Sequence, residues 1–285
     1  MEFLFSVFTP TYNRANTIGR TYEYLCKQTL RSFEWIIVDD GSTDNTEEIV
    51  QKWINTNKIS IVYLKQENGK HRAFNRAVQI AKGEIFICLD SDDYYIETAL
   101  EIIYSYHLIH KDNPWIAGFS CNSLDLHGNL IGTSLPVDEL VVSHYNLYNS
   151  LSVKGDKGLI YYTRILKEYP FPEFENEFFV TEALVLNRIS LRYKICCIKR
   201  SLEIKDYQRD GLSSKYRHLC LRNPNGYALY INERNYFNLS FTNYVINAAS
   251  YVRYSLFAGK SFRNIYKEAI NRRWTFIIAC FLGIL

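Results

Sequence analysis

In the stretch Ile85-Phe86-Ile87-Cys88-Leu89-Asp90-Ser91-Asp92-Asp93, an apolar run passes directly into three carboxylates. A short apolar run of this kind is typical of a strand that is buried on both faces. Ionised carboxylates this close together repel one another, so the cluster predicts protons or a cation that neutralise part of the charge. The alternative is a solvated Asp-rich turn, because turns favour Asp.

Upstream of this stretch, short apolar runs alternate with longer amphipathic segments, and a polar cluster follows each run. This alternation is typical of a parallel sheet with crossover helices, and ligands of such sheets bind beyond the carboxyl ends of the strands. The pattern predicts a helix after residue 44, helices over residues 16–31 and 73–82, and strands over residues 3–9, 35–38, 59–64 and 85–89.

Downstream of about residue 112 the pattern weakens, although further elements remain readable. It predicts helices over residues 142–151 and 182–193, a helical region from residue 223 onward, and strands over residues 115–121, 158–162 and 194–199. The length of 285 residues fits either one large domain or one domain with a small appendage.

The composition excludes several classes of protein. With 47% apolar residues and a net charge of +3 from 33 Lys+Arg and 30 Asp+Glu, the chain can bury a core and extensive disorder is not expected. No block of basic residues marks a nucleic-acid binder, so we expect no nucleic-acid partner. The 7 cysteines show no ligand spacing, which argues against a zinc site and a disulfide framework.

The two ends of the chain bear on its location. The N-terminus lacks a basic segment and does not resemble a secretory signal, so we expect a cytoplasmic protein. Residues 274–285 form the longest apolar run but are too short to span a bilayer. Because Arg263, Lys267, Arg272 and Arg273 precede or adjoin that run, it suits peripheral contact with the anionic cytoplasmic face of the inner membrane. Packing on the domain or on a second subunit is the alternative, and the sequence leaves the oligomeric state open.

A second acidic cluster, Asp39-Asp40-Gly41-Ser42-Thr43-Asp44, follows the apolar run of residues 35–38. Taken alone, it is an ordinary strand-to-helix connection with a capping residue. Together with Asp90–Asp93 it would share one edge of the sheet. Two acidic clusters at one edge favour a ligand that is cationic or donates hydrogen bonds. The edge of a nucleobase would suit one cluster, and a metal-bound diphosphate would suit the other.

Two more polar clusters complete the pattern. Thr9-Pro10-Thr11-Tyr12-Asn13-Arg14 ends the first strand with a hydroxyl, a ring and a cation, and suits a shelf for a nucleobase. Asn68-Gly69-Lys70-His71-Arg72-Ala73-Phe74-Asn75 places a glycine and cations before a helix N-terminus, where backbone N–H groups favour phosphate.

In their order and spacing, these clusters resemble the motifs of family 2 glycosyltransferases of the GT-A fold, as the ranges Phe8–Arg14, Val38–Thr46, Asn68–Asn75 and Gly83–Asp93 show. The resemblance implies an α/β fold with a Rossmann-like, nucleotide-binding mixed sheet flanked by helices. It implies a GT-A domain over residues 1–215, with a nucleotide-sugar half to residue 110 and an acceptor half from residue 111. Residues 216–285 would then be a helical extension.

The resemblance also implies roles for individual residues. Thr9, Pro10 and Tyr12 would line the base site, and Asp39 would contact the base edge. Asp90 would face the nucleotide sugar, while Asp92 would bind Mg²⁺ or Mn²⁺ on the diphosphate. The remaining residues expected at the donor are Arg14, Asp40, Gly69, Lys70, Asn75 and Ser91.

Inverting transfer also needs a carboxylate that removes the proton of the acceptor hydroxyl. In the family this residue belongs to a Glu-Asp pair about six residues before an Arg. Here Glu182 takes the Asp position, and Thr181 stands where the Glu is usual. Competing carboxylates lie just upstream at Glu173, Glu175 and Glu177.

Two further segments resemble family features. Gly155-Asp156-Lys157-Gly158 resembles a loop beside the acceptor. Residues 207–213 resemble the segment that closes over the donor diphosphate, where Arg209 would pair with phosphate unless it is an ordinary exposed turn residue.

The expected function is therefore an inverting, metal-dependent glycosyltransferase that moves a sugar from a nucleoside-diphosphate donor, with UDP favoured. The acceptor would be a hydroxyl of a glycan or a lipid-linked glycan in cell-surface polysaccharide synthesis. A sugar nucleotidyltransferase is one alternative. A non-catalytic nucleotide-binding scaffold is the other, because Thr181 replaces an expected acid.

Overall fold

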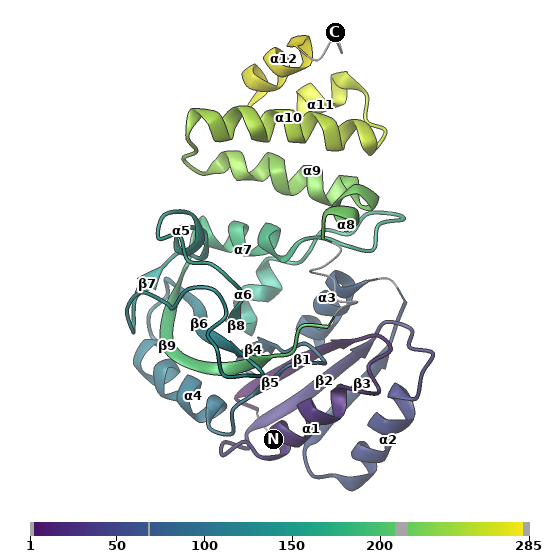
Figure 1. The fold of residues 1–285 in the computed structure, drawn as a ribbon, viewed down its shortest axis with the longest axis vertical. Helices are drawn as coiled ribbons and strands as arrows, with labels where there is room; N and C mark the ends of the chain where they lie inside the picture. The colour runs from purple at the N-terminus through teal and green to yellow at the C-terminus, as the bar shows by residue number, and fades with distance from the viewer. Residues whose placement is uncertain (1–2, 68, 209–215, 282–285) are drawn as a thin grey trace. The chain divides into compact units, whose positions relative to one another are not determined.

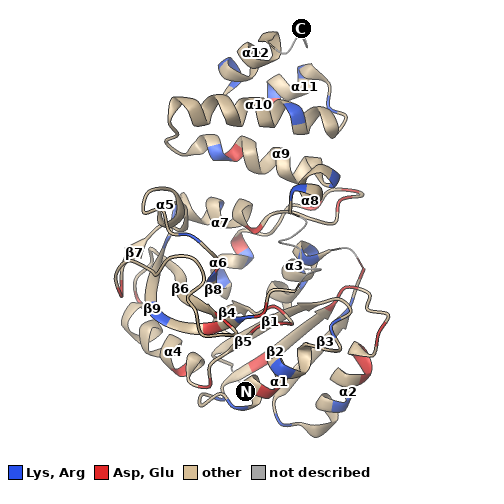
Figure 2. Ribbon diagram, in the orientation of Figure 1, with Lys and Arg blue, Asp and Glu red and all other residues tan. Residues whose placement is uncertain are grey.

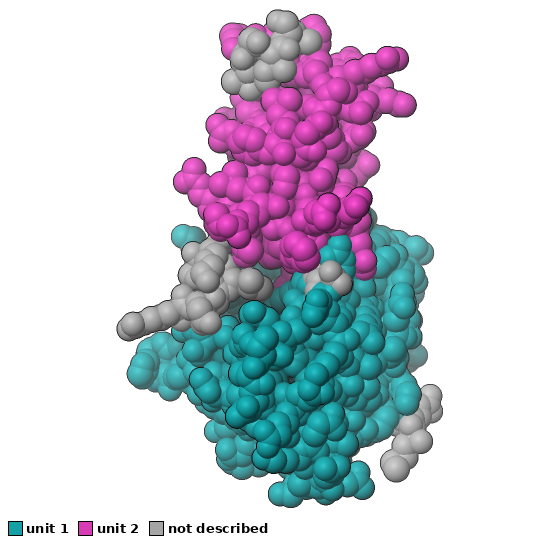
Figure 3. Space-filling view, turned by 90° about the vertical axis from the view of Figure 1, so that its right-hand side faces the viewer, with its two compact units in different colours: residues 1–170, 188–209 teal, residues 171–187, 210–285 magenta. Residues whose placement is uncertain are grey.

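The structure is a computed structural model that describes residues 3–67, 69–208 and 216–281. The chain divides into two compact units (Figure 3). Unit 1 comprises residues 1–170 and 188–209, and unit 2 comprises residues 171–187 and 210–285. One of the boundaries along the chain, between residues 187 and 188, falls within helix α7 (Glu182–Ser190).

Unit 1 is an α/β unit built around one sheet (Figure 1). Its helices are α1 (Ile18–Cys26), α2 (Thr46–Thr56), α3 (Lys70–Ile80), α4 (Ala99–His110), α5 (His144–Asn149) and α6 (Thr163–Glu168). Its strands are β1 (Phe5–Thr11), β2 (Phe33–Asp39), β3 (Ser60–Lys65), β4 (Ile85–Cys88), β5 (Tyr94–Tyr95), β6 (Ile116–Asp125), β7 (Val141–Val142), β8 (Lys157–Tyr162) and β9 (Lys194–Lys205).

The sheet has the order β3-β2-β1-β4-β8-β6-β9-β5, and β7 pairs with β9. Strands β1 to β4 pair in parallel, as the alternation of apolar and amphipathic segments predicts. β8 runs antiparallel to both of its neighbours, and β6 pairs in parallel with β9, so the sheet is mixed. The carboxyl ends of β1, β2, β4, β6 and β9 therefore meet the start of β8 at one edge.

β1, β2 and β4 are buried along nearly their whole length, which is why they read as continuous apolar runs in the sequence, whereas the edge strand β3 is half-buried or exposed. Phe5, Val7 and Phe8 of β1 are fully buried, as are Trp35 and the apolar residues that follow it in β2. Helix α3 packs against β1 and β2. This rigid core fixes the strand ends, and Figure 2 shows acidic residues in the turn that follows β4.

β9 continues well beyond the end expected from the sequence. The pattern predicts a strand over residues 194–199, whereas β9 runs to Lys205. Lys199 and Arg200 interrupt the apolar run because they are exposed, and the pairing with β6 shifts register close to them. Burial then resumes at Leu202 and Glu203. The strand therefore reaches the same sheet edge as β4.

Unit 2 is helical in its described part. It contains α8 (Tyr216–Arg222), α9 (Pro224–Glu233), α10 (Phe241–Phe257), α11 (Phe262–Glu268) and α12 (Arg272–Phe281). Its core is formed by Ala228 and Ile231 of α9, Tyr251 and Val252 of α10, and Ile265 of α11. None of the helices in the described ranges combines the length and the hydropathy needed to cross a bilayer.

Candidate active site

The candidate site is built around Asp90–Asp93, named here the aspartate turn, at the carboxyl end of β4. The backbone N–H of Asp93 donates to the carbonyl of Asp90 at 3.0 Å and closes the turn. Just before it, the N–H of Leu89 donates to the carbonyl of Phe8 at 2.8 Å and continues the pairing of β4 with β1. The turn is thus anchored to the centre of the sheet.

Helix α1 holds the aspartate turn through its backbone. The guanidinium of Arg20 donates to the carbonyl oxygen of Asp92 at 2.9 Å and to the carboxylate of Asp206 at 2.5 Å. The hydroxyl of Thr21 donates to the carbonyl of Asp93 at 2.8 Å. Neither residue is predictable from the sequence, because no local motif marks a helix residue that packs against a turn 72 positions later.

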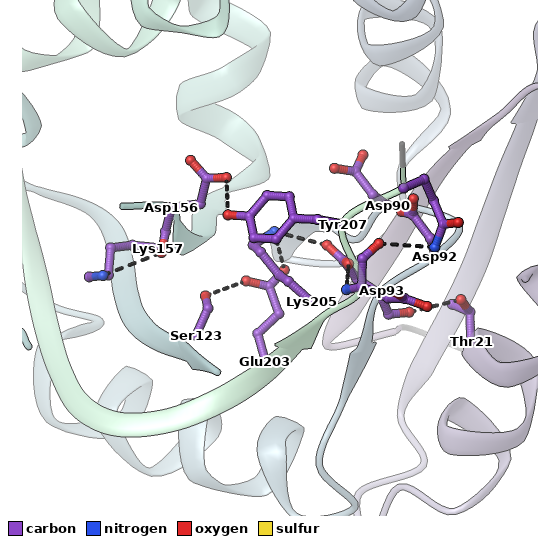
Figure 4. Close-up of polar contacts among 12 residues, drawn as sticks. Thr21, Asp90, Asp92, Asp93, Ser123, Asp156, Lys157, Glu203, Lys205 and Tyr207 are labelled. Carbon is purple, nitrogen blue, oxygen red and sulfur yellow. Dashed lines mark hydrogen bonds and ion pairs between the residues drawn. The ribbon is translucent and has the colours of Figure 1, made fainter. Parts of the chain in front are cut away.

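The end of β9 holds the same turn through the Asp93 side chain (Figure 4). Lys205 Nζ lies 2.9 Å from Asp93 Oδ2 and 3.2 Å from Glu203 Oε1, and the N–H of Asp206 donates to Asp93 Oδ1 at 3.0 Å. Ser123 Oγ donates to Glu203 at 2.7 Å. Asp93 is thus a buried anchor with both carboxylate oxygens engaged.

This network contains one ammonium, that of Lys205, between the two buried carboxylates of Asp93 and Glu203. Burial opposes the charged form of Lys205, but Glu203 and Asp93 outweigh it and raise the pKa of the ammonium. Burial raises the pKa of Asp93 even though Lys205 acts in the opposite direction. The ionised forms of Lys205 and Asp93 therefore depend on the contact between these two side chains.

Asp90 pairs with a residue from another of the predicted clusters. Lys70, the first residue of α3, places Nζ 2.8 Å from Asp90 Oδ1. Burial opposes ionisation of Asp90, but the ammonium groups of Lys70 and Lys205 outweigh that effect and lower its pKa. The structure thus brings the Gly69-Lys70 motif and the aspartate turn together, with Asp90 held as an anion.

Asp92 differs from its two neighbours. Its side chain is partly exposed, and its carboxylate accepts no hydrogen bond from another residue in the described part of the chain. Burial, followed by the charge of Asp90, raises the pKa of Asp92. A divalent cation relieves both effects, so this carboxylate fits a hard metal ion.

The donor set for such an ion is incomplete within the protein. In the ranges that the structure describes, no three His, Cys, Asp or Glu side chains are grouped as metal ligands. Mg²⁺ and Mn²⁺ commonly take one or two carboxylates together with phosphate oxygens and water. Asp92 fits that pattern as the protein ligand, with the remaining ligands supplied by a diphosphate and by solvent.

The end of β1 contributes residues of differing exposure. Thr9 is fully buried, and its hydroxyl accepts a hydrogen bond from the Trp35 indole at 2.9 Å, so its side chain is engaged within the sheet. Tyr12 is 55% exposed and follows Pro10 beyond the buried core. Thr11 is buried, and its hydroxyl has no hydrogen-bond partner among the described residues. Thr11 is not among the ligand contacts expected from the sequence.

Asp39 lies opposite Thr11 in the register of β1 and β2, so both are at the same edge. It is fully buried. Its Oδ1 accepts the N–H of Ser42 at 2.7 Å, and its Oδ2 accepts the hydroxyl of Tyr63 at 2.5 Å. Burial and the Asp39 carboxylate together raise the pKa of Tyr63, so this hydroxyl stays a donor. The Asp39 carboxylate is therefore held in a fixed orientation.

The other predicted donor residues form the loops around this edge. The N–H of Gly69 donates to both oxygens of Asp40 at 2.9 Å, which ties the loop after β2 to the start of α3. The N–H of Arg14 donates to Thr46 Oγ1 at 3.1 Å. Ser91 is buried in the aspartate turn, and Asn75 is half-buried in α3. Asn68 lies outside the described residues.

The candidate general bases belong to unit 2. Glu182 is the first residue of α7, and its side chain is partly exposed. Glu177 is buried, and its carboxylate accepts the N–H groups of Asn225 at 2.6 Å and Gly226 at 2.9 Å. Glu173 and Glu175 are exposed. The Glu177 carboxylate thus caps the N-terminus of α9.

The last predicted segment is described only at its beginning. Tyr207 is 55% exposed, and its hydroxyl donates to Asp156 at 2.8 Å. Arg209, the expected phosphate partner, lies outside the described residues. The described edge therefore presents a fixed buried carboxylate, an ion-paired carboxylate and a carboxylate that suits a metal ion, all beyond the ends of parallel strands.

Comparison with known sequences agrees with this arrangement. Residues 6–124 match the family described as glycosyl transferase family 2. The chain is 33% identical over 147 residues to the glycosyltransferase GlyG of Streptococcus pneumoniae, covering 50% of this chain and 48% of that protein. It is 39% identical over 97 residues to the Escherichia coli UDP-Glc:alpha-D-GlcNAc-diphosphoundecaprenol beta-1,3-glucosyltransferase WfaP, covering 34% and 38%. The matches thus span less than half of these relatives.

Comparison with solved structures shows the fold. TarS of S. aureus in complex with UDP-GlcNAc aligns with a TM-score of 0.61 and 20% identity, covering 93% of this chain and 84% of that one. A mannosyltransferase of Pyrobaculum calidifontis in complex with GDP-Man and Mn²⁺ aligns with a TM-score of 0.57 and 15% identity, covering 99% and 80%. These similarities confirm the expected mixed sheet flanked by helices, a GT-A-like fold.

Proposed function

We propose that the protein is an inverting glycosyltransferase, because residues 6–124 match the family described as glycosyl transferase family 2. It moves a sugar from a nucleoside-diphosphate donor, with UDP favoured, to a hydroxyl of a glycan or lipid-linked acceptor in cell-surface polysaccharide synthesis. The observation that carries the proposal is the contrast within the aspartate turn. Asp90 and Asp93 are ion-paired, whereas Asp92 accepts no hydrogen bond from another described residue.

The donor would lie across the carboxyl ends of β1, β2 and β4. Asp39, fixed by Ser42 and Tyr63, accepts an N–H from the base edge, and Tyr12 provides an exposed ring beside it. Thr11 adds a buried hydroxyl that lacks a partner among the described residues. Asp90 remains an anion because of Lys70 and orients sugar hydroxyls, which donate hydrogen bonds to it.

Asp92 would hold Mg²⁺ or Mn²⁺ on the donor diphosphate. When bound, the metal supplies positive charge that stabilises the negative charge developing on the leaving group, an effect that is commonly the largest in such catalysis. Arg20 and Thr21 hold the backbone of the turn, and Lys205 holds Asp93, so the position of Asp92 is set before the donor arrives.

Glu182 would be the general base. It takes the proton of the acceptor hydroxyl while the acceptor oxygen attacks the anomeric carbon, and the diphosphate leaves from the opposite face with the bonding electron pair. Such a base contributes about 10² to 10⁴-fold to the rate. Glu177 suits this role less well, because both of its oxygens accept backbone N–H groups.

The proposal places the protein in the cytoplasm, in peripheral contact with the membrane through its C-terminal helices. All seven cysteines are free thiols, which suits a reducing compartment. In α12, Arg272 and Arg273 are exposed, as are the rings of Phe276 and Phe281. A basic and apolar surface of this kind suits anionic lipid, where a lipid-linked acceptor would be presented.

The test is a nucleotide-sugar panel assayed with and without Mn²⁺. We expect metal-dependent binding and slow hydrolysis of one donor, with release of nucleoside diphosphate. Glu182→Gln should lower turnover by about 10² to 10⁴-fold and leave donor affinity within about twofold, because Gln keeps the shape of the side chain and removes only the basic oxygen.

Three outcomes would contradict parts of this assignment. Loss of donor affinity in Glu182→Gln would remove Glu182 from the role of base. Release of pyrophosphate would indicate a sugar nucleotidyltransferase instead. Metal-dependent binding without hydrolysis or transfer to any acceptor would favour a nucleotide-binding scaffold.

A further inference from the structure

Tyr207 and Asp156 form a polar and aromatic pair that the mechanism above does not use. Tyr207 follows the end of β9, and Asp156 directly precedes β8, so both lie at the sheet edge that carries the aspartate turn. The Tyr207 hydroxyl donates to Asp156 Oδ2 at 2.8 Å. Figure 4 shows Tyr207 lying between Asp156 on one side and Asp90 and Asp92 on the other.

The loop that carries Asp156 is rigid although Asp156 itself is exposed. Lys157 is buried, and its Nζ donates to the carbonyl oxygens of Ile131, Lys154 and Asp156 at 2.8, 3.2 and 3.3 Å. Burial lowers the pKa of this ammonium, so its desolvation is a cost that the three carbonyls offset. The side chain thus fixes the loop from within.

Backbone packing fixes the loop from the other side. Gly132 and Gly155 both have positive φ, and a Cβ on Gly132 would lie 2.0 Å from the carbonyl oxygen of Lys154. A Cβ on Gly155 would lie 2.8 Å from the Cα of Gly132. The segment around Gly132 and the segment around Gly155 therefore pack backbone against backbone, and no larger residue fits at either glycine position.

The position of Tyr207 is tied to the aspartate turn. Asp206, the preceding residue, donates its N–H to Asp93 and accepts a hydrogen bond from Arg20, which also holds the carbonyl of Asp92. The ring and the turn therefore share one anchor. The backbone just before Tyr207 is thus hydrogen-bonded to the same turn that carries Asp90 and Asp92.

We propose that Tyr207 and Asp156 form the subsite for the pyranose ring of the donor sugar, in place of the acceptor contact expected for the loop of residues 155–158, an inference that rests on the proposed function. A tyrosine ring offers an apolar face for the C–H groups of a sugar and a polar tip. Asp156 Oδ1 accepts no hydrogen bond from another described residue, so it is available to vicinal sugar hydroxyls, which bind strongly to a charged acceptor.

The charge of the subsite selects a class of sugar. Among the described residues Asp156 forms no ion pair, and the Lys157 ammonium is turned toward carbonyl groups. A sugar carboxylate placed here would meet like charge from Asp156 and from Asp90. The subsite therefore favours a neutral hexose or N-acetylhexosamine over a uronic acid.

The experiment compares nucleotides with and without their sugar by calorimetry in Mn²⁺. The probes are UDP, UDP-Glc, UDP-GlcNAc and UDP-GlcA, with GDP and GDP-Man as a second series. We expect Asp156→Asn and Tyr207→Ala to weaken binding of the preferred neutral sugar nucleotide about tenfold, the loss of one charge-assisted contact, and to change binding of the bare diphosphate less than about twofold.

Two further variants sharpen the comparison. Tyr207→Phe keeps the ring and removes the hydroxyl, so its affinity should lie between those of the wild type and Tyr207→Ala. Asp112→Asn is the matched control, because Asp112 is an exposed acid that precedes β6 at the opposite edge of the sheet. It should bind every probe as the wild type does.

The outcomes separate this inference from the proposed function. If the wild-type protein binds no nucleotide sugar, the proposed function fails and the subsite fails with it. If it binds one and Asp156→Asn weakens sugar nucleotide and bare diphosphate equally, or neither, only the subsite is overturned. Preference of the wild type for UDP-GlcA would also overturn it, whereas a gain of UDP-GlcA affinity in Asp156→Asn would support it.

Discussion

At the scale of single residues, three aspartates in one turn have three different environments. Asp93 is enclosed by Lys205 and the backbone of Asp206, and Asp90 is paired with Lys70. Asp92 has a partly exposed carboxylate whose pKa is raised by burial and by Asp90. Identical side chains therefore differ by environment alone: one is a buried anchor, one is an ion-paired anion, and one is a carboxylate that accepts no hydrogen bond from another described residue.

Asp92→Asn and Asp93→Asn should therefore change stability in opposite directions. Ionised Asp92 destabilises the metal-free fold at pH 7, so Asp92→Asn should raise the free energy of unfolding while removing Mn²⁺-dependent donor binding. Asp93→Asn also removes a buried charge, but it takes away one of the two carboxylates that raise the pKa of the buried Lys205 ammonium, so it should lower that free energy by roughly 3 kcal/mol. Chemical denaturation without metal, with Asp112→Asn as the control, measures both effects.

The pH dependence of the same comparison follows from the sign of the shift. A carboxyl whose pKa is raised by folding is protonated in both states below about pH 4, where its charge costs nothing. The cost appears as pH rises through the folded pKa. The gap in stability between Asp92→Asn and the wild type should therefore be small at pH 4 and largest at pH 7. A gap that widens toward acid would contradict the assignment of Asp92.

At the scale of elements, the end of β9 positions much of the candidate site. Because β9 runs in parallel with β6 to Lys205, it delivers Lys205, Asp206 and Tyr207 to the edge where β4 ends. A strand that stopped at residue 199, as the sequence pattern predicts, would place none of them there. The exposed Lys199 and Arg200 hide this continuation, because they break the apolar run while pairing resumes beyond them.

Glu177 and Glu182 are expected to have different roles, one structural and one catalytic. Glu177 accepts the N–H groups of Asn225 and Gly226 at the N-terminus of α9, where negative charge is favoured. Glu177→Ala should lower the stability of the protein by about 1 to 2 kcal/mol and leave turnover at saturating substrate nearly unchanged. Denaturation and steady-state kinetics on the same samples provide the measurement.

Glu182→Gln is the matched comparison for Glu177→Ala. It should reverse the pattern, with unchanged stability and strongly reduced turnover. If Glu177→Gln, which keeps the size of the side chain, lowers turnover 100-fold or more in a fully folded protein, then Glu177 rather than Glu182 is the base.

At the scale of the whole molecule, the C-terminal helices give the protein a second surface with its own chemistry. We expect the protein to bind vesicles that contain anionic lipid and to leave neutral vesicles unbound, because exposed Arg272 and Arg273 adjoin the exposed rings of Phe276 and Phe281. Co-sedimentation should fall as salt rises, since salt screens exposed charges.

The double variant Arg272→Gln/Arg273→Gln should weaken vesicle binding, and Phe281→Ser should weaken it at high and low salt alike. Neither variant should change donor affinity, which provides the control for folding. Equal binding to neutral and anionic vesicles, or none to either, would remove the membrane contact from the proposal.

The parallel strands β1 to β4, the helices between them and the polar clusters at their ends are predictable from the amino-acid sequence. These features are local, because a strand buried on both faces must be apolar throughout and its ends must carry the turn residues. The clusters of Gly69-Lys70 and Asp90–Asp93 were identified in this way, and the structure joins them through Lys70 and Asp90.

The partner of each polar side chain is known only from the folded chain. Arg20 and Asp206 are 186 positions apart, and Lys205 and Asp93 are 112 positions apart. No spacing in the sequence predicts either contact. The same holds for Trp35, which engages the hydroxyl of Thr9 within the sheet. Local patterns fix where a polar side chain emerges, but its charge and availability depend on whichever distant residue the folded chain packs against it.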